Sequence, residues 1–232
     1  MITVRRSHER GYADHGWLQS YHSFSFAHYY DPRHMNFRNL RVINEDWIAP
    51  GQGFPMHPHQ DMEIVTYIIE GQLEHKDSTG GGEVLGPGEI QRMSAGTGIR
   101  HSEFNPSSTD PVHLLQIWIE TEKPGINPDY EQKSYREFEN LDGLTLLAAR
   151  ENDGDGVSIH QDVNVFSGRL PAGSELHQPI ADGRHVWVQI VSGELTVNGN
   201  QLGAGDAVAL SEEATLEISA GSDSRFLVFD LN

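Results

Sequence analysis

The stretch that decides the fold begins GQGFPMHPHQDMEIVTYIIEG at residues 51–71 and closes with SAGTGIRHSEFN at residues 94–105. Short runs of β-branched and aromatic residues alternate here with glycines, a pattern typical of strands joined by tight turns. The first apolar run stops at Gly71, and a second strand is predicted from Gln72 to His75. The stretch therefore predicts a sheet of short strands.

Two pairs of metal-binding side chains lie in this stretch. His57 and His59 form one pair, and His101 and Glu103 form the other. Because successive side chains of a strand point to opposite faces, the two members of each pair share a face. On facing strands the pairs would place three imidazoles and one carboxylate around one point. Histidine pairs also occur on solvated strand faces, but two pairs in one glycine-punctuated β segment favour a metal site.

The donor set indicates the class of metal but leaves the carboxylate open. Three imidazoles with one carboxylate suit a transition metal better than calcium or magnesium, which prefer oxygen ligands. Glu63 is also an even number of residues from His59, so it would share the face of His59 on a regular strand. On spacing alone, either Glu103 or Glu63 could complete the site.

Composition bounds the class of protein. At 232 residues with 37% hydrophobic content, the chain is long enough for two small domains or one large β domain. Its 34 acidic residues against 16 basic ones give a formal net charge of −18, which repels nucleic-acid phosphates and anionic membrane surfaces. The absence of cysteine excludes disulfides, a thiolate nucleophile and any cysteine-based metal site. No apolar run reaches about 18 residues, so we expect a soluble, cytoplasmic protein that binds neither nucleic acid nor membrane.

The composition divides the chain into two strand-rich parts. Residues 1–125 are expected to form an N-terminal, metal-binding domain, and residues 146–232 a C-terminal domain that again alternates short strands with glycine turns. Residues 126–145 are expected to be a linker with at most one helical turn, since they are charged, with scattered apolar positions. Asn198-Gly199 is a strong β-hairpin signal in the C-terminal part.

The two parts repeat one another. A β run directly before a glycine turn occurs at residues 67–71 and again at residues 189–193, which indicates a duplicated β-barrel. Near the positions that match the metal-binding pairs, the second copy offers only His177, His185 and Glu217, without the paired spacing. We therefore expect the metal chemistry in the first copy and no metal in the second.

The residues around the histidine pair resemble the first motif of the cupins. In this motif Gly51 is followed by His57-x-His59 and then by Glu63. The second motif departs from the general cupin pattern, because extra residues precede His101 and a serine stands where proline is common.

That departure points to one family of cupins. SFSFA at residues 23–27, HPH at residues 57–59 and MSAGTGIRHSE at residues 93–103 make the chain similar to the pirin family of bicupins. The resemblance covers essentially the whole chain and favours the bacterial pirins of the quercetinase type. It implies an all-β fold, a bicupin of two jelly-roll β-barrels, with the metal in the N-terminal barrel.

The resemblance also implies the metal and its ligands. The residues that match the family's ligands are His57, His59, His101 and Glu103. The implied cofactor is one divalent transition metal, Fe(II) first, with Cu, Mn, Ni, Co or Zn as alternatives. In many other cupins the carboxylate ligand is the residue that matches Glu63. By resemblance to pirins, Glu63 would instead orient a histidine or hold water.

The implied activity is that of a dioxygenase that cleaves a flavonol such as quercetin, with a small aromatic substrate and dioxygen as reactants. Glu103 would act as a weak ligand and as general base toward the substrate hydroxyl. Phe54 and Met56 would line an apolar pocket, or pack within the barrel as ordinary core residues. Asn105 would donate a hydrogen bond near the site or cap a turn.

Two other functions remain open on the sequence. Other pirins are metal-dependent regulatory proteins that bind transcription regulators or metabolic enzymes, so a protein partner is the main alternative. A cupin isomerase, or a relic whose metal is only structural, is the second.

Overall fold

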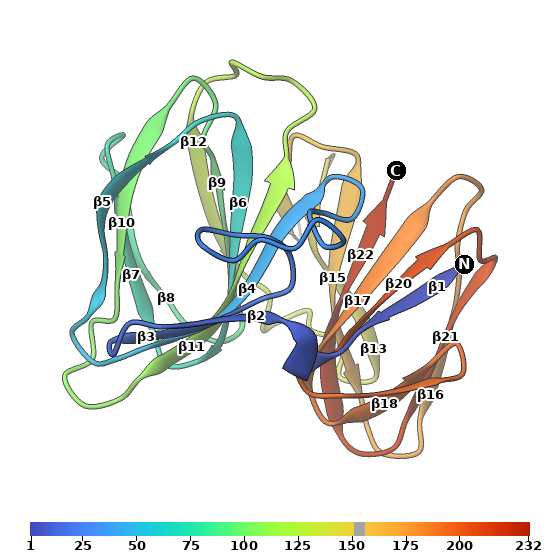
Figure 1. Ribbon diagram of the computed structural model, residues 1–232. Helices are drawn as coiled ribbons and strands as arrows, with labels where there is room; N and C mark the ends of the chain where they lie inside the picture. Colours follow the sequence, from blue (N-terminus) through green and yellow to red (C-terminus); the bar gives the residue numbers. More distant parts are fainter. Residues whose placement is uncertain (151–155) are drawn as a thin grey trace.

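The computed structural model describes residues 1–150 and 156–232, and these form two β-barrels side by side (Figure 1). Each barrel consists of a seven-stranded sheet and a four-stranded sheet. This confirms the predicted all-β fold of two barrels. Apart from strands, the chain has one turn of 3-10 helix, η1 (Ser7–Glu9), among the described residues. In the same residues, no helix has the length and apolar character needed to cross a membrane.

The first barrel holds the stretch that the sequence singled out. Its large sheet runs, from edge to edge, β12 (Asp129–Ser134), β9 (Glu89–Ser94), β6 (Met62–Glu70), β11 (Val112–Glu120), β4 (Leu40–Ile48), β3 (Leu18–His22) and β2 (Gly11–Asp14). Its small sheet runs β5 (Gly53–His59), β10 (Ile99–Phe104), β7 (Leu73–Asp77) and β8 (Gly82–Leu85).

The second barrel repeats this plan. Its large sheet runs β1 (Ile2–Arg5), β20 (Ala207–Ser211), β17 (His185–Ser192), β22 (Ser224–Leu231), β15 (Val163–Leu170), β13 (Gly143–Ala149) and β14 (Val157–Ser158). Its small sheet runs β16 (Glu175–Pro179), β21 (Thr215–Ala220), β18 (Glu194–Val197) and β19 (Asn200–Gly203). The predicted hairpin at Asn198-Gly199 joins β18 to β19, and both residues have the positive φ, 42° and 79°, that a type I′ turn requires.

The structure differs from the expected domain division at two edge strands. β12 lies within residues 126–145, the expected linker, and pairs with β9 of the first barrel. β1 lies within residues 1–125, the expected N-terminal domain, yet it pairs with β20 of the second barrel. Edge strands carry many polar residues because one side of the strand has no partner. The composition of β12 therefore resembles that of a linker, and composition alone does not show which sheet β1 joins.

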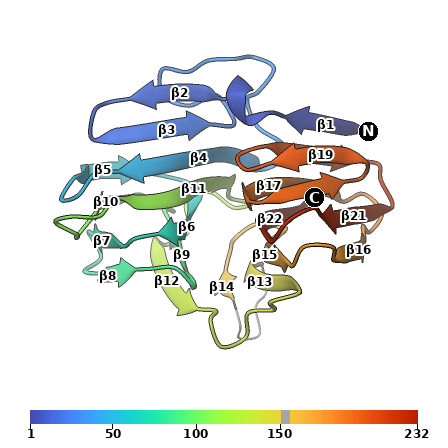
Figure 2. The same cartoon turned by 90° about the horizontal axis from the view of Figure 1, so that it is seen from below.

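The two large sheets pack against each other. The largest apolar cluster of the protein joins Tyr67 and Ile117 of the first barrel to Trp187 and Phe229 of the second. Figure 2 shows β4 and β11 of the first barrel beside β17 and β22 of the second. Each large sheet has one face at this interface, and its other face lines the inside of its own barrel.

The interiors of the two barrels differ in polarity. In the large sheet of the second barrel, paired residues on four neighbouring strands form an apolar row across the sheet. At the corresponding strands of the first barrel, the row is polar. The apolar row is Phe166, Val228, Val188 and Val208, and the polar row is Asn44, Gln116, Thr66 and Gln91. The interior of the second barrel is therefore mainly apolar, whereas polar side chains line the interior of the first barrel.

Candidate metal centre

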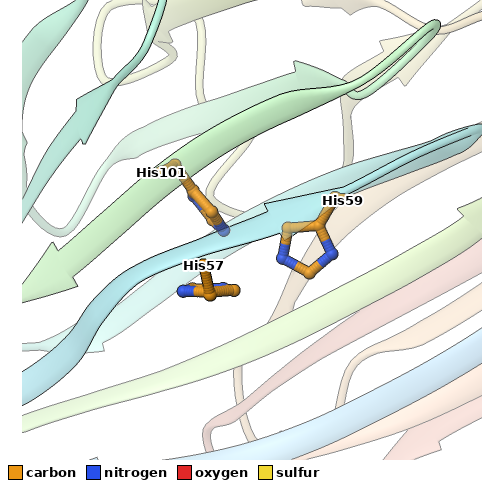
Figure 3. A group of neighbouring side chains, drawn as sticks. All are labelled: His57, His59 and His101. Atoms are coloured by element: carbon orange, nitrogen blue, oxygen red, sulfur yellow. The ribbon is translucent and has the colours of Figure 1, made fainter.

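Three histidines converge inside the first barrel. His57 and His59 extend from β5, and His101 extends from β10, where it lies directly opposite His57 (Figure 3). The ring centroids are 4.4 Å apart for His57 and His101, and 4.8 Å apart for His59 and each of the other two. One ring nitrogen from each histidine lies within 4.8 Å of the others, a spacing suited to a shared metal ion. The predicted histidine cluster is thus present as a spatial group.

A β-bulge in β5 lies opposite the step from His101 to Glu103. From His57 to Phe54 strand β5 advances three positions, while its partner β10 advances only two, from His101 to Glu103. Pro55 and Met56 together lie opposite Ser102, and Pro55 has no N–H to lose from the sheet ladder. The carbonyl oxygen of Pro55 lies 2.8 Å from Nδ1 of His57. A carbonyl oxygen can only accept a hydrogen bond, so Nδ1 of His57 carries the proton. Nε2 of His57 then has the lone pair that can bind a metal.

Gly53 permits the close approach of β5 to β10 beside this bulge. A Cβ at position 53 would lie 2.1 Å from the backbone oxygen of Glu103. We predict that Gly53→Ala lowers the free energy of unfolding by roughly 1–3 kcal/mol, as overpacking does. Chemical denaturation measures this value, with Gly203→Ala as the control, since the described residues place no atom within 4 Å of a Cβ there. Equal stability losses in the two variants would contradict the close-approach argument.

Two of the three histidine rings, His59 and His101, are held in the neutral state. Burial, together with the neighbouring imidazoles, lowers the pKa of His59 to about 4 and the pKa of His101 to about 3. Neutral imidazole is the form that binds metals. Among the described residues, Nε2 of His101 is buried and has no hydrogen-bond partner. A buried nitrogen without a partner costs free energy, and a metal ligand is the role that would explain it. The residues present therefore fit a transition metal.

Glu103 lies beside the histidines. It is buried on β10, and one of its carboxylate oxygens lies within 4.8 Å of a ring nitrogen of His101. The side-chain amide of Gln116 donates to both carboxylate oxygens, at 3.1 and 2.9 Å. Thr66 in turn donates to the amide oxygen of Gln116 at 3.0 Å. The polar row of the large sheet thereby fixes the orientation of the carboxylate.

Glu63 lies elsewhere. The chain turns at Asp61, whose φ is 47°, so β5 ends at His59 and Glu63 belongs to β6 in the other sheet. The fully buried Glu63 accepts a hydrogen bond from Ser94 at 2.8 Å and lies 3.5 Å from the ring of His160 in the second barrel. The expectation that Glu63 shares a face with His59 fails, because no single regular strand contains both residues.

Two groups of possible metal ligands occur in the described residues, and both lie in the first barrel. The second group is His75, His101 and Glu103. His75 lies on the strand predicted from Gln72 to His75, but no role was predicted for it. Of the residues named for the second copy, His177 lies opposite Glu217 across β16 and β21, while His185 is hydrogen-bonded to Ser211.

A cavity of about 520 Å³ opens beside the histidines, and Glu103 also lines it. Its walls are aromatic or apolar at Leu18, Phe26, Phe54 and Trp118, and polar at Ser20, His22, Asn44 and Asp46. Of the two alternatives given for Phe54 and Met56, Phe54 lines the cavity, whereas Met56 does not line it and is 45% exposed. Asn105 caps a turn, since it donates to the carbonyl oxygens of Ile48 and Asp110.

The chain is similar to known proteins over its whole length. The profile of the Pirin family matches residues 3–119, and that of the Quercetinase C-terminal cupin domain matches residues 146–231. The quercetin 2,3-dioxygenase of Escherichia coli strain K12 is 49% identical, with 100% of this chain and 99% of that protein covered. A pirin-like protein of Caulobacter vibrioides is 39% identical, with 99% of each chain covered. The crystal structure of the bacterial pirin YhhW from Escherichia coli in complex with nickel(II) superposes with a TM-score of 0.95, at 48% identity and covering 100% of this chain and 99% of that one.

Proposed function

The chain belongs to the pirin family, and on that premise we propose that it is a metal-dependent dioxygenase that cleaves a flavonol such as quercetin. The observation that carries the proposal is a cluster of three histidines, two of which line an aromatic-walled cavity together with Glu103. The volume of about 520 Å³ lies within the range of about 300–1,000 Å³ typical of small-molecule sites.

In this proposal His57, His59 and His101 hold one divalent transition metal, with Glu103 as the carboxylate ligand. Fe(II) is the metal we expect first, and Cu, Mn, Co and Zn are alternatives. The nickel(II) complex of the Escherichia coli pirin supports a divalent metal and supports Ni, which the resemblance also implied, as a further alternative. When bound, the metal supplies Lewis acidity toward the substrate hydroxyl and the redox chemistry that dioxygen requires.

Glu103 is proposed to take the proton from the substrate hydroxyl. Its carboxylate lines the cavity, so a bound hydroxyl can reach it. The Gln116 amide donates to both of its oxygens, which fixes the plane of the carboxylate and leaves further lone pairs for the substrate. A fixed carboxylate within hydrogen-bond reach of the hydroxyl is the geometry that general-base catalysis needs.

The aromatic walls suit a flat substrate. Trp118 meets the ring of His59 edge-on at 4.9 Å, and Phe26 meets Trp118 edge-on at 5.3 Å. These contacts hold the indole beside the histidines, where an aromatic substrate can pack against it and water is excluded.

A polar strip on β3 and β4 is proposed to bind further hydroxyl groups of the substrate. Among the described residues His22, Asn44 and Asp46 line the cavity, and each has a buried side-chain atom without a hydrogen-bond partner. Burial, with the nearby carboxylates Glu103 and Glu45, raises the pKa of Asp46 to about 7. A large share of the Asp46 side chains is therefore protonated at neutral pH and can donate as well as accept.

We predict that Asp46→Leu lowers kcat/KM for quercetin by roughly 3–10-fold, the cost of about one hydrogen bond. A flavonol without ring hydroxyls beyond the one that reacts should be affected much less, because it has no group for Asp46 to bind. Steady-state kinetics on both substrates measure the difference, with Asp46→Asn as the isosteric control. An equal loss on both substrates would show that Asp46 acts on the fold rather than on recognition.

The proposed activity is tested by loading the protein separately with Fe(II), Cu(II), Mn(II), Co(II) and Ni(II) and following the loss of quercetin absorbance in air. Turnover above that of the metal salt alone, with at least one metal, is the expected result. If no metal gives such turnover, flavonol cleavage is abandoned. Metal-dependent retention of a protein partner in a pull-down would then favour the regulatory alternative.

A further inference from the structure

His75 lies directly behind the metal-facing histidine of β10. It is fully buried on β7, which pairs with β10 so that His75 lies opposite Glu103 and Asp77 lies opposite His101. Nδ1 of His75 is 3.5 Å from Nδ1 of His101, and Nε2 of His75 is 3.1 Å from a carboxylate oxygen of Asp77. The atoms form a continuous line from His101 through His75 to Asp77.

The hydrogen-bond partners decide where the protons of His75 lie. The side-chain amide nitrogen of Gln91 is 3.2 Å from Nδ1 of His75 and can only donate, so this Nδ1 is an acceptor. Nε2 of His75 therefore carries the proton and donates it to Asp77. The single lone pair of this nitrogen is shared between the Gln91 amide and Nδ1 of His101, 3.5 Å away, where a second lone pair would repel it and an N–H is attracted. Nδ1 of His101 is thus the protonated nitrogen, and its lone pair lies on Nε2.

Asp77 is anchored as a carboxylate at the far end of the line. It accepts hydrogen bonds from the backbone N–H of Thr79 at 2.7 Å, from the hydroxyl of Thr79 at 2.5 Å and from the backbone N–H of Gly81 at 3.3 Å. Burial acts to raise the pKa of Asp77, but the donors from Thr79, His75 and Gly81 outweigh it and lower the pKa. The carboxylate is therefore ionised and fixed.

Packing holds the middle of the line in place. The ring of Tyr130, from the edge strand β12, stacks on the ring of His75 with centroids 4.8 Å apart and planes 25° apart. A stacked and fully buried ring has little freedom to rotate, so His75 presents its Nδ1 to His101 permanently. By contrast, Lys76 between His75 and Asp77 points outward and is exposed.

We propose that His75 and Asp77 are positioning residues that lock His101 in the Nδ1–H tautomer and so present Nε2 of His101 to the metal. Partners of this kind orient a ligating imidazole and raise its basicity. The inference rests on the proposed function only in that it requires a metal at the three histidines. It does not depend on the substrate.

The test uses metal affinity and the tautomer itself rather than turnover. Competition with a chelator gives the Kd for Ni(II), and long-range proton–nitrogen NMR of the Zn(II)-loaded protein shows which nitrogen of each histidine carries a proton. We expect His75→Leu to weaken Ni(II) binding by about 10–100-fold and to free the Nδ1 proton of His101 for exchange. His75→Gln should restore most of the affinity, because its amide oxygen can accept from His101. Lys76→Gln, on the same strand, should match the wild type.

The outcomes separate this inference from the proposed function. If the wild type binds neither Ni(II) nor Zn(II), the metal centre itself is wrong and both proposals fall. If the wild type binds Ni(II) and a folded His75→Leu variant binds it with equal affinity and an unchanged His101 tautomer, only the positioning pair is refuted. If His75→Leu does not fold, Asp77→Asn decides, since it keeps the size of the side chain. Weaker Ni(II) binding in Asp77→Asn supports the pair, and unchanged binding refutes it.

Discussion

Replacing His101 with alanine is expected to weaken binding of a divalent metal by roughly 100-fold or more, beyond the loss of about 10–100-fold that an outer-shell partner causes. The variant removes Nε2 of His101, which is buried and has no partner in the described residues, and it leaves only the two half-buried histidines of β5. Quercetin turnover should be lost together with the metal. Metal content after dialysis and chelator competition measure the first effect, and flavonol absorbance measures the second.

The second barrel offers a matched control for this variant. His177 lies on β16, the strand that occupies in the second barrel the place of β5 in the first. His177→Ala should therefore leave both metal binding and turnover at the wild-type level. Full metal affinity in His101→Ala, or an equal loss in His177→Ala, would contradict the assignment of the site to the first barrel.

Glu103→Gln is expected to lower kcat by about 100- to 10,000-fold, the contribution of a general base. The amide cannot take up the substrate proton, although it keeps the size of the carboxylate and one hydrogen-bonding oxygen toward Gln116. The three histidines remain, so metal binding should weaken much less than in the His101 variant. Steady-state kinetics on the metal-loaded protein, with the metal content determined in the same sample, separate the two effects.

Glu63→Gln is the matched comparison for Glu103→Gln. Glu63 is hydrogen-bonded to Ser94 and lies beside His160 at the contact between the barrels. We expect the Glu63 variant to keep near-wild-type kcat and to lose about 1–3 kcal/mol of stability, because a buried hydrogen-bonding group is perturbed. If Glu63→Gln abolished turnover and Glu103→Gln did not, the roles of the two carboxylates would be reversed.

The sequence alone was enough to predict the features that depend on the alternation of side chains between the two faces of a strand. His57-x-His59 and His101-x-Glu103 each keep their alternation within one strand, so the prediction that each pair shares a face is met. The duplication was also visible, because glycine turns follow matching β runs in both halves. These signals are local, and the local geometry of a strand determines them.

The features that the sequence did not reveal depend on contacts between distant residues. The chain turns at Asp61, which has a positive φ, so that Glu63 lies in the other sheet. The alternation of side chains between the faces of a strand does not continue through such a turn. His75 and Asp77 share a face of β7, but their place behind His101 follows only from β7 pairing with β10. The edge strands β1 and β12 carry polar residues, so only their pairing with β20 and β9 shows that they belong to the barrels.

The central claim is that the metal-loaded first barrel cleaves a flavonol with dioxygen. The most direct measurement supplies isotopically labelled dioxygen to the Fe(II)-loaded protein with quercetin, and follows dioxygen uptake together with the mass of the product. Our account predicts one dioxygen consumed for each flavonol lost, both labelled atoms in the cleaved product, and neither effect in His101→Ala. Loss of quercetin without label in the product, or at the same rate in His101→Ala, would contradict it.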